Sequence, residues 1–316
     1  MTDRNARQRV MTMHAFRSGL VWLLSLLIVA TTTARDVYVN NVIGNDMNVG
    51  GRTDVRPQDG PVRTLNRALR LVDRGGRIVV ANTGEPYREM ISVCDVEQRG
   101  YPGQPLVIQG NGAVLDGTVA TAPGAWTYET DNIFSFRPRR LTYQQLFRDG
   151  KPLARLRTTN FPGATLPLEP LRWALLTDRI AFRVEDGNLP EHYALRHAGL
   201  QAGITLYNTE HVRIEDLVVQ GFQLDGISAR ELVRNCQLVR VECRANGRSG
   251  ISVGGVSRVS LSSCNAYDNG RAQLRVEGRG RVTAERCDFD KDGKDVPWLE
   301  LRGGRAVVDG QQFLTP

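Results

Sequence analysis

The sequence predicts an all-β fold, a right-handed parallel β-helix, on three observations. Short motifs recur at a nearly constant step: "LDGIS" around Gly226, "RSGIS" around Gly250, "NGRAQLRV" from Asn269 and "DGKDVPWLEL" from Asp292. Steps of 23 or 24 residues between these motifs are typical of a solenoid. Each repeat also holds several short strands separated by bends, and the Leu/Asn consensus of leucine-rich repeats is absent.

Alternation within the repeats supports strands. In "CNAYDNG" and "CDFDKDG" the residues Cys264 and Ala266 align with Cys287 and Phe289, and we expect these four to face the core. Equivalent residues of neighbouring coils should then stack about 4.8 Å apart. The outward positions between them are Asn265, Tyr267, Asp288 and Asp290.

The N-terminal segment reads as a secretory signal peptide spanning residues 1–34. Four arginines precede the apolar run "GLVWLLSLLIVA", and the small residues Thr32 and Ala34 follow it. The run is shorter than the roughly 20 residues that a membrane span needs, although an uncleaved anchor stays open as an alternative. We therefore expect one mature domain, residues 35–316, that is secreted, periplasmic or displayed at the cell surface.

The elements follow in a simple order. "DVYVNN" predicts a short strand, and "GPVRTLNRALRLVDRGG" predicts a capping helix with an apolar face ended by Gly75 and Gly76. Closely spaced β-rich runs come next. The pattern loosens over residues 126–196, which hold most aromatic residues and many prolines, and this stretch is expected to be a long insertion. Regular coils resume from Gly203 and continue nearly to the C-terminus.

Charge and cysteine content narrow the function. Removal of residues 1–34, with four arginines and one aspartate, lowers the formal charge from +7 to +4, so nucleic acid is not an expected partner. The five cysteines are odd in number and form no C-x-x-C pair, which argues against a disulfide framework or a zinc site. Cys264 should lie over Cys287, and two reduced core thiols are favoured over a bond between them.

A polar column at one bend carries the resemblance to a known family. Asn246, Asn269 and Asp292 align, and an amide ladder there would satisfy backbone groups that the bend leaves unpaired. With these residues, and with "GGRIVVANTGEPYREMISV" and "IQGNGAVLDG", residues 36–310 resemble the pectate-lyase-like right-handed β-helix superfamily. That superfamily contains lyases, hydrolases, esterases and proteins that are not enzymes, so the resemblance implies the fold and leaves the reaction open.

The adjacent column supplies the candidate catalytic residues. Arg248, Arg271 and Lys294 align, and three cations about 5 Å apart repel one another unless anions lie between them. An acidic sugar chain could supply those anions. The resemblance implies that an Arg or Lys here could abstract a proton. Solvated arginines partly paired with Asp225 or Asp295 are the alternative.

Asp225 is the fourth candidate catalytic residue. The segment "NGRSGISVGG" is similar to a polygalacturonase motif, in which a His stands where this chain has Ser249. Asp225 is expected to stack on Ser249 and Ala272, and not on further carboxylates. The sequence therefore does not favour polygalacturonase chemistry.

Three aspartates provide the candidate metal site. Asp288, Asp290 and Asp292 copy the start of a calcium loop, but Leu299 stands where such a loop has its bidentate acid. Asp288 and Asp290 should lie about 6.7 Å apart on one outer face, in the column of Glu242. Calcium is thus the expected cofactor if there is one. A carboxylate pair of an inverting glycosidase, or a solvated row, is the other interpretation.

The sequence as a whole predicts an exported monomer that binds a polysaccharide, with an acidic polysaccharide favoured. It could cleave this glycan as a lyase or a glycoside hydrolase. The alternatives are a glycan-binding protein without activity and a surface-structural solenoid. An enzyme should have a deep groove with convergent titratable groups, whereas a binder should have a shallow polar face.

Overall fold

The larger of two parallel sheets runs through every coil of the protein. The computed structural model describes residues 35–315 except 58, 95–96, 158–165 and 290–295. In this part of the chain the larger sheet has eleven strands, of which β24 and β25 alone pair antiparallel. Its members are β1 (Asp36–Val39), β2 (Arg77–Val80), β4 (Leu106–Asp116), β14 (Val212–Gln220), β16 (Cys236–Val239), β17 (Glu242–Arg244), β19 (Arg258–Ser262), β20 (Asn265–Tyr267), β22 (Arg281–Glu285), β24 (Arg305–Val308) and β25 (Gln311–Leu314).

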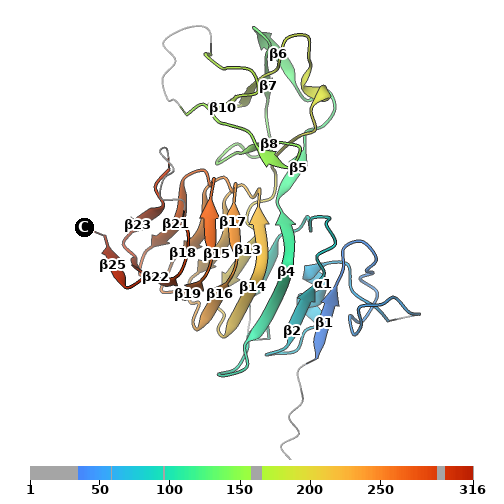
Figure 1. The fold of residues 1–316 in the computed structure, drawn as a ribbon, viewed down its shortest axis with the longest axis vertical. Coiled ribbons are helices and arrows are strands. Elements are labelled where there is room, and N and C mark those ends of the chain that lie inside the picture. Colours follow the sequence, from blue (N-terminus) through green and yellow to red (C-terminus); the bar gives the residue numbers. More distant parts are fainter. Residues whose placement is uncertain (1–34, 58, 95–96, 158–165, 290–295, 316) are drawn as a thin grey trace, which may run out of the picture. The chain divides into compact units, whose positions relative to one another are not determined.

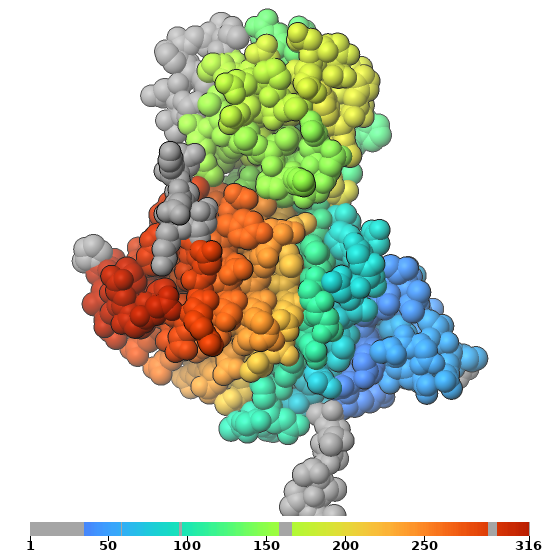
Figure 2. Space-filling view, viewed as in Figure 1, coloured from blue at the N-terminus to red at the C-terminus, as the bar shows by residue number. Residues whose placement is uncertain are grey.

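A second parallel sheet of six strands closes each coil on another side. Its order is β23 (Leu299–Arg302), β21 (Ala272–Glu277), β18 (Ser249–Val253), β15 (Asp225–Arg230), β13 (Ile204–Tyr207) and β3 (Ile91–Cys94). The chain passes alternately between the two sheets, so each turn of chain stacks on the one before (Figure 1). On the surface the coils form successive bands of colour from blue to red (Figure 2). The predicted parallel β-helix is confirmed.

One continuous apolar core fills the coils. Alternate strand residues point inward, as in β18, where Ile251 and Val253 are buried over Leu274 and Val276 of the next coil. The inward set predicted from the cysteine-containing repeats is also correct, since Cys264, Ala266, Cys287 and Phe289 are buried. Asn265 and Asp288 are exposed on the outer face. Cys236, Cys243, Cys264 and Cys287 form no disulfide among the described residues.

The predicted amide ladder is present at the bend. The Asn269 side-chain oxygen accepts hydrogen bonds from the backbone N–H (2.9 Å) and the amide (3.0 Å) of Asn246. The Asn246 oxygen accepts from the backbone of Phe222, and the Asn269 amide donates to the carbonyl of Cys243. Both asparagines are buried, so the ladder satisfies polar groups that water does not reach. Asp292, predicted to extend the ladder, lies outside the described residues.

A second column of bends lies within the eleven-stranded sheet. One residue of each coil there has a left-handed backbone conformation without being glycine, which is uncommon. Side chains compensate locally: Arg240 donates two hydrogen bonds to Asp216, and Asp309 accepts one from the backbone of Arg286. The column consists of Asp216, Arg240, Ser263, Arg286 and Asp309, with φ between 48° and 53°.

The two ends of the stack are covered differently. At the N-terminal end, helix α1 (Leu65–Leu71) buries Leu65, Ala68 and Leu69 against the core, as predicted. Carboxylate oxygens of Glu89 accept the first backbone N–H groups of α1. At the C-terminal end, β25 folds back antiparallel on β24. No helix in the described ranges is long and apolar enough to cross a membrane.

The predicted insertion is a folded unit with two antiparallel sheets, and it extends slightly beyond residues 126–196. Its sheets are β10 (Trp173–Leu175), β11 (Ile180–Arg183), β7 (Ile133–Phe136) and β6 (Thr127–Thr130), and β5 (Thr118–Ala120), β12 (Leu195–Ala198), β8 (Leu146–Arg148) and β9 (Lys151–Pro152); a short 3-10 helix η1 spans Pro190–His192. Trp126, Trp173 and Phe182 form its core. These rings are therefore not free to stack on a sugar.

The last coil departs from the predicted step of 23 residues. Leu274 of β21 pairs with Leu299 of β23, a step of 25, whereas Asn265 still pairs with Asp288 at 23. The two additional residues thus lie between Asp288 and Leu299. As a consequence, Glu300 and not an earlier residue lies beside Arg275.

The amide ladder yields a stability prediction. Asn269→Ala should lower the free energy of unfolding by about 2–3 kcal/mol, because the backbone N–H of Asn246 and the carbonyl of Cys243 lose their partners while buried. Asn265→Ala, at an exposed position four residues earlier, is the matched control and should change little. Urea unfolding of both variants measures the difference. Equal losses would show that the ladder adds no stability.

Candidate functional site

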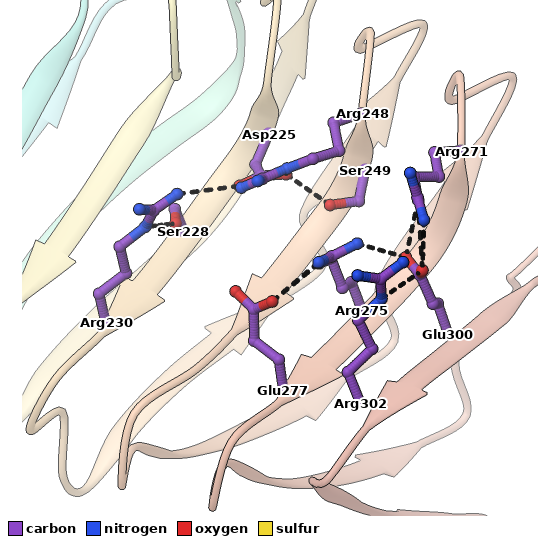
Figure 3. Close-up of polar contacts among 10 residues, drawn as sticks. All are labelled: Asp225, Ser228, Arg230, Arg248, Ser249, Arg271, Arg275, Glu277, Glu300 and Arg302. Atoms are coloured by element: carbon purple, nitrogen blue, oxygen red, sulfur yellow. Dashed lines mark hydrogen bonds and ion pairs between the residues drawn. The ribbon is translucent and has the colours of Figure 1, made fainter. Parts of the chain in front are cut away.

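A network of charged side chains covers the outer face of the six-stranded sheet (Figure 3). It arises because alternate residues of β15, β21 and β23 face away from the core. The charges alternate in sign between neighbouring coils: Arg275 lies beside Glu300, and Glu277 beside Arg302. The network comprises Asp225, Ser228, Arg230, Arg248, Ser249, Arg271, Arg275, Glu277, Glu300 and Arg302.

Asp225 is the most deeply buried member, with none of its surface exposed. It stacks on Ser249, which stacks on Ala272, as predicted. Its carboxylate accepts hydrogen bonds from Nε (2.9 Å) and Nη2 (2.5 Å) of Arg248 and from Oγ of Ser249 (2.5 Å). The charge of Asp225 is thereby matched at close range by a forked guanidinium.

This pairing changes the interpretation of Arg248. The hydrogen bond to Asp225 raises the pKa of Arg248, although burial acts in the opposite direction. A base must give up its proton near the working pH, so the raised pKa opposes the proton-abstracting role considered for Arg248. The sequence predicted that anions lie between the stacked cations. For Arg248, that anion is the carboxylate of Asp225.

Arg271 is neutralised in the same way by a residue that sequence reasoning did not place there. Its Nη2 lies 3.1 Å from Oε1 of Glu300, and the hydrogen bond to Glu300 raises the pKa of Arg271. Glu300 also accepts from Arg275 (2.5 Å) and Arg302 (2.9 Å). The sequence held a signal for this contact, since "RVE" from Arg275 and "ELR" from Glu300 carry opposite charges, but the 23-residue step misaligned them.

The predicted metal site is only partly within the described residues. Asp288 is exposed and pairs with Asn265, which in turn pairs with Glu242, so the predicted outer column is correct. Glu242 is already held by Arg244 (2.5 Å) and Tyr267 (2.6 Å). Asp290, Asp292 and Lys294 lie outside the described residues. Among the residues that the structure describes, no cluster of three or more His, Cys, Asp or Glu side chains could hold a metal. Calcium binding stays a prediction.

A pocket of about 490 Å³ lies where the insertion meets the coil bends. We call it the junction pocket. Gly247 and Gly270, from the repeated "NGR" bends, lie in its wall. A Cβ atom on Gly247 would be 1.6 Å from the carbonyl oxygen of Tyr143, so only glycine allows the insertion to approach this closely. The lining residues are Leu141, Thr142, Tyr143, Arg155, Leu175, Leu176, Thr177, Gly247, Gly270 and Arg271.

Arg155 is the residue of the junction pocket that is least well compensated. Its guanidinium carbon lies 5.2 Å from the centre of the Trp173 ring, and its buried Nε has no hydrogen-bond partner. Burial, and then the nearby charge of Arg157, lower the pKa of Arg155 to about 10. No Asp or Glu is among the described residues that line the pocket. The pocket is therefore a place where a negative ligand group would be stabilised.

The buried ion pair yields a second stability prediction. Arg248→Ala should cost about 3–5 kcal/mol of unfolding free energy, because it leaves the buried charge of Asp225 without its main partner. Arg302→Ala removes an arginine whose side chain is 52% exposed, and should cost about 1 kcal/mol or less. Denaturant unfolding compares the two. If Arg248→Ala cost no more than Arg302→Ala, the pair would not hold the coils together.

The charge network also predicts a dependence on pH. Burial raises the pKa of Glu300, but the hydrogen bond from Arg271, the charge of Arg275 and the hydrogen bond from Arg302 together bring it below its ordinary value of 4.5. A depressed carboxyl pKa adds stability above the unfolded value, and this part is lost as pH falls through the folded value. Stability should therefore drop as pH falls below about 4.5.

The measurement is unfolding free energy between about pH 6 and about pH 3. Glu300→Gln should remove part of the acid-induced drop. Glu169→Gln, which changes a 76% exposed glutamate, should leave the drop unchanged. The same drop in all three proteins would contradict the assignment to Glu300.

Comparisons with known proteins agree with this architecture. Residues 197–309 match the family model for a "Right handed beta helix region". A solved structure described as a glycoside hydrolase has a TM-score of 0.52 and 13% identity, over 80% of this chain and 73% of that one. No curated protein sequence matches the chain.

Two further solved structures cover more of this chain with lower scores. Pectate lyase Pel9A has a TM-score of 0.43 and 10% identity, over 87% of this chain and 62% of that one. A GH136 lacto-N-biosidase from Eubacterium ramulus has 0.40 and 12%, over 87% and 50%. At these identities a likeness concerns the fold alone. The chain thus has the fold of a right-handed parallel β-helix.

Proposed function

We propose that the protein binds an acidic polysaccharide and holds a uronate-type residue of that glycan in the junction pocket. The observation that carries this proposal is Arg155, a half-buried cation with an unpartnered Nε in a pocket that no described carboxylate lines. A guanidinium forks a carboxylate with two parallel hydrogen bonds. A sugar carboxylate would thus supply the anion that the chain does not provide to Arg155.

The other walls of the pocket suit a sugar ring. Leu141, Leu175 and Leu176 provide apolar surface for the C–H face of a ring, whereas Thr142 and Thr177 provide hydroxyl groups. The volume of about 490 Å³ is that of an ordinary small-ligand site. Mixed walls of this kind orient a polar ligand while removing part of its surface from water. Export across a membrane, through residues 1–34, would bring the protein to such a glycan.

Elimination is the reaction that the pocket supports best, as a second step of the proposal. Tyr143 lines the pocket next to Arg271, and the guanidinium of Arg248 lies 6.0 Å from the centre of its ring. Neutralisation of the sugar carboxylate by Arg155 would acidify the C–H bond beside it. The Tyr143 oxygen, as the phenolate, would take that proton, a C=C bond would form, and the glycosidic C–O bond would break with its electrons passing to the leaving sugar oxygen. That oxygen would then take the proton back from Tyr143, which would restore the phenolate.

Hydrolysis by two carboxylates is less well supported by this geometry. Asp225 and Glu300 are each occupied by guanidinium groups, and neither lines the junction pocket. An inverting pair needs one carboxyl group as an acid and one as a base, with room for water between them. The described residues offer no such pair in the pocket. Asp288, Asp290 and Asp292 would hold calcium if it binds, and its charge would help to neutralise an acidic glycan.

Binding is tested with the protein starting at Arg35, using polygalacturonate, alginate and neutral dextran as probes. Arg155→Ala should weaken binding of the acidic glycan about tenfold to a hundredfold, because one charge-assisted contact is lost. Arg172→Ala, an exposed arginine of the insertion paired with Glu169, is the matched control. Unchanged affinity in Arg155→Ala would overturn the proposed site.

Cleavage is followed separately, with calcium or with a chelator, as new reducing ends and as absorbance of unsaturated product. Tyr143→Phe should keep the affinity for glycan and lose unsaturated product, because the ring remains while the proton acceptor is removed. New reducing ends without unsaturation would indicate hydrolysis and contradict elimination. Binding with no product from any glycan would leave a binding protein.

A further inference from the structure

Three arginines stack directly on the outer face of the eleven-stranded sheet. Arg258 of β19 pairs in register with Arg281 of β22, which pairs with Arg305 of β24. We call these three residues the arginine row. They lie about 4.8 Å apart along the stack, since neighbouring parallel strands have that separation. The row belongs to a different sheet from the charge network of Figure 3.

The arginine row differs from that network in having no counter-ions among the described residues. Arg258, Arg281 and Arg305 are all exposed, and none of their side chains forms an ion pair or a hydrogen bond with a described residue. Arg248 and Arg271, also in neighbouring coils, each have a carboxylate of the chain. Like charges at this spacing repel one another, so an anion between them would be bound favourably.

The surface beside the row is hollowed and polar. Two hollows, of about 550 and about 390 Å³, share Arg213, Gln237 and Ser260 and so form one track across successive coils. Gln237, Ser260 and Thr283 stack in register along this track. Amide and hydroxyl groups on these three successive coils are suited to hydrogen bonds with sugar hydroxyls.

The ends and the charge of the track also fit a glycan. Tyr101 lines one end and is 44% exposed. The Arg74 guanidinium lies over one face of its ring, 4.0 Å from the centre, so the opposite face is the one that would pack on a sugar ring. Three arginines line the two hollows: Arg213, Arg240 and Arg286. Arg213 is paired with Glu215 and Arg240 with Asp216, so the positive charge that is not already paired comes from Arg286 and from the adjacent arginine row. The track therefore combines positive charge with regularly repeated polar groups.

We infer that this face is a second binding surface, for a linear acidic polysaccharide that lies along the stack with its negative groups against the arginine row. The regular spacing favours a ligand with a regular repeat over a single small anion. A nucleic acid is disfavoured, because single strands are held by successive aromatic platforms. Among the described residues that line the hollows, Tyr101 and His211 carry the only aromatic rings, and both lie in the same hollow. The inference does not depend on the junction pocket, since no residue is shared between the two sites.

The test replaces the whole row while keeping side chains of similar length: Arg258→Gln, Arg281→Gln and Arg305→Gln together. The matched control replaces three exposed arginines elsewhere, Arg56, Arg70 and Arg172, by glutamine, so that both triple variants lose the same charge. Binding of polygalacturonate and of dextran sulfate is measured at several salt concentrations, with neutral dextran as the uncharged probe. Circular dichroism checks that both variants are folded.

The row variant should bind the acidic probes about tenfold to a hundredfold more weakly than the control, with a smaller dependence on salt. Equal affinity of the two triple variants would overturn the inference. Tighter binding to anionic lipid vesicles or to single-stranded DNA than to either acidic glycan would overturn the ligand class. Those two probes therefore belong in the same experiment.

The outcome can be separated from that of the proposed function. The row substitutions are repeated in the Arg155→Ala background, where a separate surface should still show the same loss of affinity. Loss in the row variant together with unchanged Arg155→Ala would support the arginine row and reject the junction pocket. The reverse result would reject the row and support the pocket.

Discussion

Direct stacking of equivalent residues is the constraint on which the rest of this structure depends. Each parallel strand lies about 4.8 Å from its neighbours, so whatever one coil places at a position meets what the next coil places there. Apolar residues gain from this arrangement, as the column of Ile227, Ile251 and Leu274 shows. Asparagines gain as well, since each amide both donates and accepts. Charges of the same sign are the residues that stacking penalises.

The two sheets differ in how the repulsion between stacked cations is compensated. On the six-stranded sheet, carboxylates lie beside the basic column: Asp225 forms an ion pair with Arg248, and Glu300 forms one with Arg271. On the eleven-stranded sheet the arginine row has no such partners among the described residues. On the first surface each arginine of the network has a carboxylate neighbour, whereas the second surface gains from an external anion. Arg155 of the junction pocket belongs with the second kind, although burial rather than stacking produces its unmet charge.

The fold was largely predictable, because the spacing of equivalent residues in a repeat indicates the length of each coil and the positions of its strands. The capping helix, the inward positions of Cys264 and Phe289, the Asn246–Asn269 ladder and the insertion all follow from local pattern. The ion pairs of Glu300 could not be predicted from this spacing. Two additional residues before β23 change the register of the last coil, so that Glu300 lies beside Arg275. Arg155 and Gly270 both line the junction pocket, although more than a hundred residues separate them in the sequence. The repeat spacing does not predict a contact at that separation.

The arginine row had a signal in the sequence, since "SRVS", "GRVT" and "GRAV" each carry an arginine at the same strand position. Whether these arginines form a row depends on the register of the strands. The same register allows the length of the row to change. A solenoid coil contacts mainly its two neighbours, so a lineage can gain or lose a whole coil without redesigning the others. Each such event would lengthen or shorten the row by one arginine. The length of such a binding face can thus be matched to the length of a polymer during evolution, in increments of one coil.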